Sequence, residues 1–94
     1  MTQKKIPNSV PGSDLLNKGL EDLHSKKLTE ESLLVLVGKK NLQNAGISIP
    51  DFEIDGLPEH KLYRLLALRL GNQAHSSYNA LIGKLCSAER ILAS

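Results

Sequence analysis

Cysteine and aromatic residues are scarce in this sequence of 94 residues. The single cysteine, Cys86, excludes a disulfide within the chain. Three aromatic residues and no tryptophan argue against a surface on which single-stranded nucleic acid stacks. Cys86 follows an apolar position of a helical stripe, and the sequence predicts that it is a small buried side chain without the partners that make a thiol reactive.

Charge of one sign and long apolar runs are also lacking. Twelve basic and ten acidic residues give a net charge of +2, which is too small to drive binding to nucleic acid or to a membrane unless the charges are clustered. No run of about 18 apolar residues occurs, and the first residues lack the apolar segment of a secretory signal. We therefore expect no membrane association and a cytoplasmic location.

Leucine dominates what the sequence does contain, with 18 leucines against six isoleucines and three valines. Unbranched apolar side chains favour helices over strands, and this length suits one domain with one modest core. We predict an all-α fold, with a single domain over residues 13–94 built as a small bundle of four to five helices that ends in a C-terminal helical hairpin. Residues 1–12 contain two prolines and are predicted to form a flexible N-terminal arm, in which Ile6 and Val10 are apolar enough to dock.

A first helix is predicted over residues 14–26. Ser13 or Asp14 is of the type that caps a helix N-terminus by accepting hydrogen bonds from backbone N–H groups. Gly19 lies inside this helix and weakens it by about 1 kcal/mol relative to alanine.

A second helix is predicted to begin at residue 30. Thr29 precedes two glutamates, and this order is typical of a capped helix start. The apolar run 33–37 fits either a buried helix or a buried strand, and the preceding cap favours the helix. One further short turn closes at Gly46, and an extended connector then places Ile47 and Ile49 in the core.

The second half of the chain predicts two longer helices. Pro58 suits the first position of a helix over residues 58–70, whose leucines cover more than one face and predict that it is the central helix. Gly71 and the asparagine after it predict a break before a last helix over residues 73–92. The alternative is one unbroken helix from 58 to 92, which a glycine inside the helix disfavours.

The last helix carries a clear apolar stripe. Its members recur at spacings of four and three residues and are Ala74, Tyr78, Leu81, Leu85, Ala88 and Leu92. A helix of about 30 Å is difficult for a short first helix to cover. We therefore predict a homodimer with Tyr78, Leu81, Leu85 and Leu92 in its interface.

No residues have the spacing of a catalytic, metal or phosphate site, so we predict no catalytic residue, no metal and no cofactor. Asp51, Glu53, Asp55 and Gly56 are similar to the opening of an EF-hand calcium loop. Leu62 stands where that loop needs a bidentate glutamate, so an acidic surface loop is the better interpretation.

The three histidines do not lie at zinc-binding spacings. If the last two helices form an antiparallel hairpin, their polar edges bring Arg64 near residues 77–79. Arg64, His75 and Asn79 are then candidates for a small-molecule or anion site, with salt bridges and interhelical hydrogen bonds as the simpler interpretation.

Lysine occurs in three pairs in the first half of the chain, and acidic residues gather at 51–59. The lysine pairs are Lys4-Lys5, Lys26-Lys27 and Lys39-Lys40. This asymmetry fits either solvated loops or the steering of a partner by complementary charge. Residues 29–46 resemble a helix-turn-helix in outline, but the second helix would be too short to enter a DNA groove.

These features favour a small helical protein-interaction or regulatory domain without catalytic activity, whose partner is another protein or a second copy of the chain. Catalytic motifs are absent, whereas leucine-rich helical faces that need partners are abundant. The alternatives are a nucleic-acid-binding protein that uses the lysine pairs, or a small-ligand binder with a polar site between the last two helices. No motif is specific enough to indicate a family.

Overall fold

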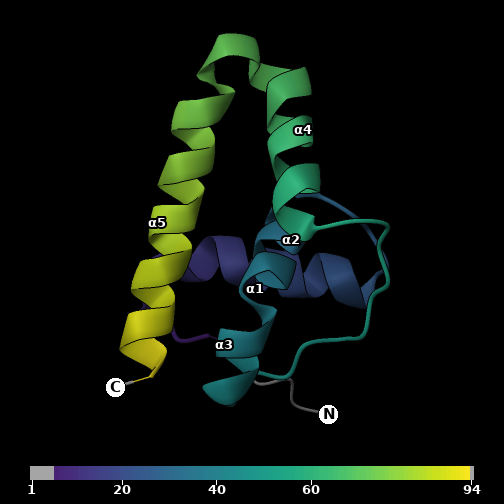
Figure 1. Ribbon diagram of the computed structural model, residues 1–94. Helices are drawn as coiled ribbons and strands as arrows, with labels where there is room; N and C mark the ends of the chain where they lie inside the picture. The colour runs from purple at the N-terminus through teal and green to yellow at the C-terminus, as the bar shows by residue number, and fades with distance from the viewer. Residues whose placement is uncertain (1–5, 94) are drawn as a thin grey trace.

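The computed structural model describes residues 6–93 and shows an all-α protein. Helices, with one 3₁₀ turn included, account for 69% of the described residues, and no strand occurs among them, so the all-α prediction is confirmed. The elements are α1 (Ser13–His24), α2 (Glu30–Val37), α3 (Lys39–Asn44), α4 (Pro58–Leu70), the 3₁₀ turn η1 (Gly71–Gln73) and α5 (Ala74–Leu92). α4 and α5 run side by side from η1, and α1 lies crosswise at their open end (Figure 1).

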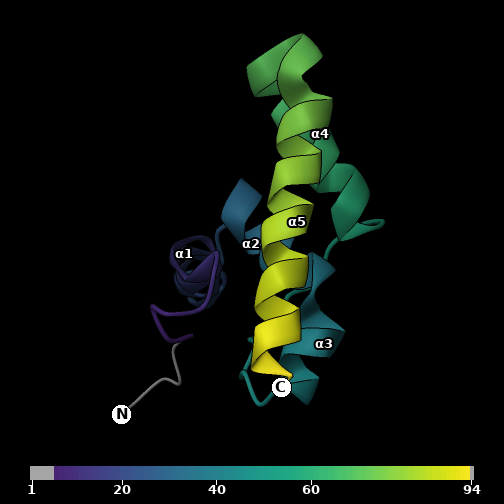
Figure 2. The same ribbon diagram turned by 90° about the vertical axis from the view of Figure 1, so that its left-hand side faces the viewer.

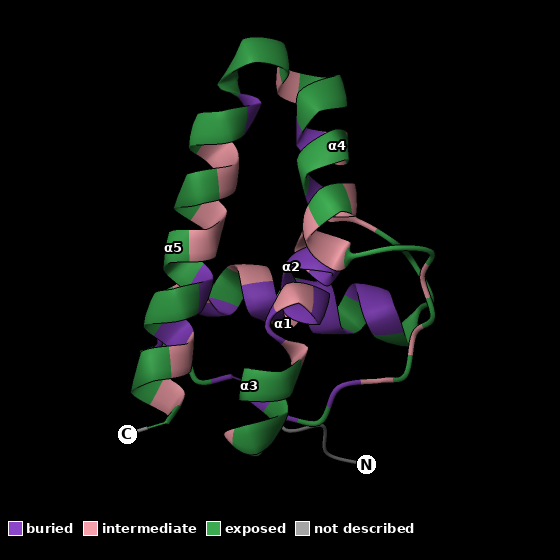
Figure 3. Cartoon of the chain, in the orientation of Figure 1, coloured by how far each residue is buried: buried purple, intermediate pink, exposed green. Residues whose placement is uncertain are grey.

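α2 is the central helix, which corrects the prediction that residues 58–70 hold this place. It contacts α1, α3, α4 and α5, and its Leu33 and Val35 are fully buried. α4 buries Leu62 and Leu66, whereas its Leu68 is 80% exposed. Since α2 has apolar residues on every side, it fills the centre and leaves α4 at the periphery (Figure 3).

The start of α2 follows the local sequence signals. The Thr29 hydroxyl accepts a hydrogen bond from the Ser32 backbone N–H at 3.1 Å, and the Ser32 hydroxyl accepts one from the Thr29 N–H at 2.7 Å. This reciprocal cap satisfies two backbone donors that the first turn would otherwise leave unpaired. The helix start at residue 30 and the helical state of residues 33–37 are therefore confirmed.

Asp22 ties α1 to this cap. Its carboxylate accepts hydrogen bonds from the Thr29 hydroxyl at 2.6 Å and from the Lys18 ammonium at 3.1 Å. The hydrogen bond from Thr29 is the largest cause that holds the pKa of Asp22 below its ordinary value, and Lys18 adds to the effect. The hydrogen bond from Lys18 to Asp22 also raises the pKa of Lys18.

α1 begins and ends differently from the prediction. The residue before it, Gly12, has a left-handed backbone with φ 78°, and no side chain caps the helix, so the predicted cap by Ser13 or Asp14 is wrong. The hydroxyl of Ser13 turns instead to the carbonyl oxygen of Asn8, at 3.5 Å. The helix ends at His24, two residues early, because Lys26 takes a left-handed backbone with φ 59°.

Gly19 lies where α1 crosses α2. A Cβ atom there would overlap the carbonyl oxygen of Glu31 and come within 2.6 Å of Cγ2 of Val35. The absence of a side chain therefore allows the two backbones to approach closely. This contact offsets the intrinsic cost of a glycine inside a helix.

The first described residues dock on α1. The backbone N–H of Ile6 donates to Oδ1 of Asn17 at 2.9 Å, and Nδ2 of Asn17 donates to the Ile6 carbonyl at 3.0 Å. Ile6 and Val10 are buried, as their apolar character allows. Residues 1–5 of the predicted arm, with the pair Lys4-Lys5, lie outside the described residues.

The connectors and the last two helices follow the predicted boundaries closely. Ile47 and Ile49 are buried in the extended segment after α3, as predicted. α4 ends at Leu70, and Gly71 takes φ 58°, so the break is present and the single unbroken helix is not. Figure 2 shows α1 almost end-on beside α5. Within residues 6–93, no helix combines the length and the apolar character needed to cross a bilayer.

Candidate functional site

The apolar stripe of α5 faces the body of its own chain. Leu85 is 2% exposed, and Tyr78, Leu81 and Leu92 are half-buried against the core. α2, α3 and α4 supply that cover. The predicted dimer interface on these four residues assumes an uncovered face of the last helix, whereas the chain itself covers much of that face, and self-association stays a prediction.

The predicted polar site is only partly assembled. Nδ2 of Asn79 lies 3.2 Å from Nε2 of His75, one helical turn away, and the ring of Tyr63 packs edge-on against both His75 and Tyr78. Arg64 is exposed and forms no hydrogen bond or ion pair within residues 6–93. The structure therefore brings His75 and Asn79 together, and no hydrogen bond or ion pair among the described residues links Arg64 to them.

Cys86 is exposed, so the prediction that it is a buried side chain is wrong. It directly follows the buried Leu85, and neighbouring residues on a helix point about 100° apart. One step around α5 is thus enough to move the thiol from the core to the solvent.

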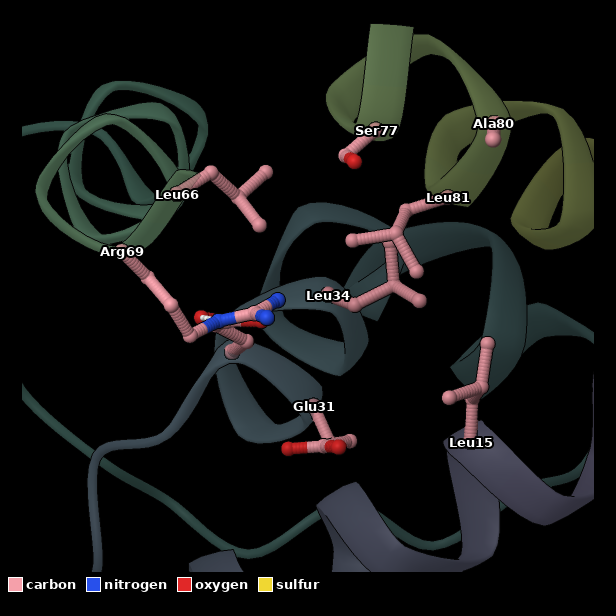
Figure 4. Close-up of a pocket in the computed structure, with 9 residues that line it drawn as sticks. Leu15, Glu31, Leu34, Leu66, Arg69, Ser77, Ala80 and Leu81 are labelled. Carbon is pink, nitrogen blue, oxygen red and sulfur yellow. Dashed lines mark hydrogen bonds and ion pairs between the residues drawn. The ribbon is translucent and has the colours of Figure 1, made fainter. Parts of the chain in front are cut away.

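A cavity of about 250 Å³ lies where α1, α2, α4 and α5 meet, and we call it the inner cavity. Most of its wall is apolar: Leu15, Leu34, Leu66, Ala80 and Leu81. The side chains of Leu66 and Leu81 and the hydroxyl of Ser77 point toward the same space (Figure 4). This is a small, mostly apolar site, formed by one to three side chains from each of four helices.

The mouth of the inner cavity is charged. Nε and Nη2 of Arg69 each donate to a carboxylate oxygen of Glu30 at 2.8 Å, which is the two-pronged geometry that a guanidinium favours. The hydrogen bonds to Glu30 raise the pKa of Arg69. Glu31 also lines the mouth and forms no hydrogen bond or ion pair through its side chain with residues 6–93. The ion pair therefore joins the start of α2 to the end of α4, and Glu31 leaves one negative charge beside it.

A second, shallower hollow, which we call the outer depression, shares this charged border. Thr29, Leu65 and Leu68 line it together with Glu30, Glu31 and Arg69. Leu68 is the most exposed large apolar side chain in the described chain. The outer depression thus adds an accessible apolar surface next to the mouth of the inner cavity.

Comparison with known proteins assigns no family. No protein-family model, no curated protein and no solved structure matches this chain. Within residues 6–93, no three His, Cys, Asp or Glu side chains gather to hold a metal ion, and no buried side-chain nitrogen or oxygen lacks a hydrogen-bond partner. The function must therefore be argued from the inner cavity and the outer depression.

The sequence offers only weak signals for these surfaces. Every leucine of the inner cavity has the helical spacing of a core residue, and core residues and cavity-lining residues share that pattern. Arg69 and Glu30 are 39 residues apart, so no local spacing pairs them. One usable signal is the position of Leu68, which lies outside the face of α4 that contains Leu62 and Leu66.

Proposed function

We propose that this chain is a protein-interaction or regulatory module without catalytic activity, a small bundle of four to five helices ending in the α4–α5 hairpin. In this proposal the inner cavity receives one apolar side chain of a protein partner. The observation that carries the proposal is an apolar cavity of about 250 Å³ with a charged mouth.

The size of the cavity favours a side chain over a metabolite. Sites for drug-sized ligands usually measure about 300 to 1,000 Å³, whereas an apolar cavity of about 150 Å³ accepts benzene. A leucine or phenylalanine side chain therefore fits the inner cavity, and most cofactors do not.

The arrangement of polarity supports the same interpretation. Protein interfaces combine an apolar centre, often a pocket that takes an anchor side chain, with a polar border. Leu34 and Leu66 form the apolar floor, while Glu31 and the ion pair of Glu30 with Arg69 form the border.

The test fills the cavity and asks whether binding is lost. Peptides are selected from a random displayed library on the parent protein, and the affinities of the selected peptides are measured. Ala80→Phe places a ring at the cavity wall, and the matched control Ala67→Phe adds the same ring to an exposed position of α4 that does not line the cavity.

We expect Ala80→Phe to weaken peptide binding at least about tenfold, or about 1.4 kcal/mol, and Ala67→Phe to leave it unchanged. Both variants should keep the helical circular dichroism of the parent. The proposal fails if no apolar peptide is selected, or if selected peptides bind Ala80→Phe as well as they bind the parent.

The two alternative functions have less support. Nζ of Lys39 lies 3.9 Å from Oδ1 of Asp51, so the acidic loop offsets part of the positive charge of that lysine pair that a nucleic acid would need. A small-ligand site between α4 and α5 would need Arg64 beside His75, and no hydrogen bond joins these two residues within the described range.

A further inference from the structure

The corner between α1 and α2 carries opposite charges on the two sides of an exposed leucine. Its sequence is Lys-Lys-Leu-Thr-Glu-Glu over residues 26–31. When two copies of this segment lie antiparallel, Lys26 of one can face Glu31 of the other, while Glu30 stays paired with Arg69 of its own chain. A twofold interface requires a surface that complements itself, and this segment does so in charge.

The corner is held in place before any contact is made. The N–H of Lys26 donates to the Leu23 carbonyl at 3.0 Å, and the N–H of Lys27 donates to the Asp22 carbonyl at 2.7 Å. The Thr29 cap fixes the other end. Leu28 is thus presented with 40% of its surface exposed on an ordered backbone, which reduces the entropy lost on association.

An apolar surface lies directly beside this corner. Thr29, which follows Leu28, lines the outer depression together with Leu65 and the exposed Leu68. Leu28 of a second copy can cover that surface while Lys26 of each corner meets Glu31 of the other. Glu31 forms no hydrogen bond or ion pair through its side chain with residues 6–93 and interacts with Lys18 and Arg69 only at longer range, so its carboxylate can still accept a close contact from a second copy.

We propose that the outer depression and the corner at residues 26–31 form the interface of a symmetric homodimer. This interface lies away from the α5 stripe, which the chain itself covers. It uses no residue of the floor of the inner cavity but shares the charged border of Glu30, Glu31 and Arg69 with it, so Lys26→Glu and Leu68→Ser, which lie outside the inner cavity, test the dimer separately from the cavity.

The experiment is a charge exchange followed by sedimentation equilibrium. Lys26→Glu and Glu31→Lys are prepared separately, and each places like charges opposite each other in its own homodimer. An equimolar mixture of the two variants restores both attractive contacts, because the carboxylate introduced at position 26 of one copy then faces the ammonium group introduced at position 31 of the other. Lys40→Glu makes the same charge change at an exposed position of α3 and serves as the control.

We expect a parent dimer whose dissociation constant rises at least about tenfold in each charge variant, with recovery in the mixture and no change in Lys40→Glu. Leu68→Ser should weaken the dimer without loss of helical signal. A parent that stays monomeric at about 0.5 mM in low salt overturns the proposal. A dimer that persists in both variants, or a mixture that stays dissociated, also overturns it. None of these results depends on whether peptides bind the inner cavity.

Discussion

The α1–α2 corner is packed more tightly than the α4–α5 hairpin, and a glycine in each region shows the difference. At Gly19 in α1 an added Cβ would strike the backbone of α2, whereas at Gly83 in α5 it would meet nothing within 4 Å. The corner also contains a reciprocal cap and a carboxylate with two hydrogen-bond donors. The α1–α2 corner, which we call the platform, is therefore tightly packed, whereas the hairpin leaves open space beside Gly83.

This difference explains where a binding surface can form. A region with close backbone contact has no room for an occupant, whereas α2 and α4, which meet through leucines and one surface ion pair, leave space between them. The inner cavity lies at the junction of the two regions, with Leu15 and Leu34 from the platform and Leu66 and Leu81 from the hairpin.

The largest expected effect comes from the same substitution in both regions. We expect Gly19→Ala to lower the free energy of unfolding by about 3 kcal/mol, because the new methyl group forces α1 away from α2. Gly83→Ala should raise it by about 0.5 to 1 kcal/mol, because alanine is the better helix former and the added Cβ meets open space. Urea unfolding of both variants measures these values.

The sign of the two changes is what matters. If Gly19→Ala is neutral or stabilising, the close approach of α1 and α2 is wrong, and the contrast between the two regions disappears. If Gly83→Ala destabilises the protein by more than about 1 kcal/mol, α5 is covered on a side that the structure leaves open.

A smaller effect is expected at Asp22 and depends on pH. Since folding lowers its pKa, the ionised carboxylate contributes stability above its ordinary pKa of 3.8, and that contribution is lost as the pH falls through the lower value of the folded state. Asp22→Asn should therefore cost about 1 to 2 kcal/mol at neutral pH and progressively less below pH 3.8. Thermal unfolding across this range measures the difference, with Asp55→Asn in the exposed loop as the control.

A cost of Asp22→Asn that stays constant from neutral pH down to about pH 2 would show that ionisation of this carboxylate is unimportant for the corner.

The smallest effect concerns labelling of the hairpin. Cys86 is exposed on α5, so a thiol reagent should label it in the native protein at a rate within about tenfold of the rate in denaturant. A cysteine at the buried position 85, made as Leu85→Cys with Cys86→Ser, should react far more slowly in the native protein. The reagent reaches a buried thiol only when the surrounding structure opens locally. Protection of Cys86 in concentrated parent protein would place α5 in an interface and contradict the proposed dimer.

Signals that act within a few residues predicted much of the fold. Thr29 with the glutamates after it gave the start of α2, and Gly71 gave the end of α4, because caps and helix breaks are decided by neighbouring backbone groups. Ile47 and Ile49 were placed in the core for the same kind of reason.

Features that depend on how helices cross were not accessible from the sequence. Gly19 was interpreted as a weakness of α1, since only the position of α2 reveals the contact that it permits. Cys86 was assigned to the core because the exact rotation of α5 decides which neighbour of Leu85 faces inward. The inner cavity combines residues from four helices, and its existence depends on all their angles together.

The ion pair of Arg69 with Glu30 gives the boundary between the inner cavity and the outer depression an unusual character. Both hollows are lined by these two side chains, so the wall that separates them is made of charge and not of packed carbon. Dissolved ions weaken exposed charge pairs and leave apolar contacts largely intact. The boundary between the two hollows is therefore weaker at high ionic strength, whereas the leucines that line each hollow keep their contacts.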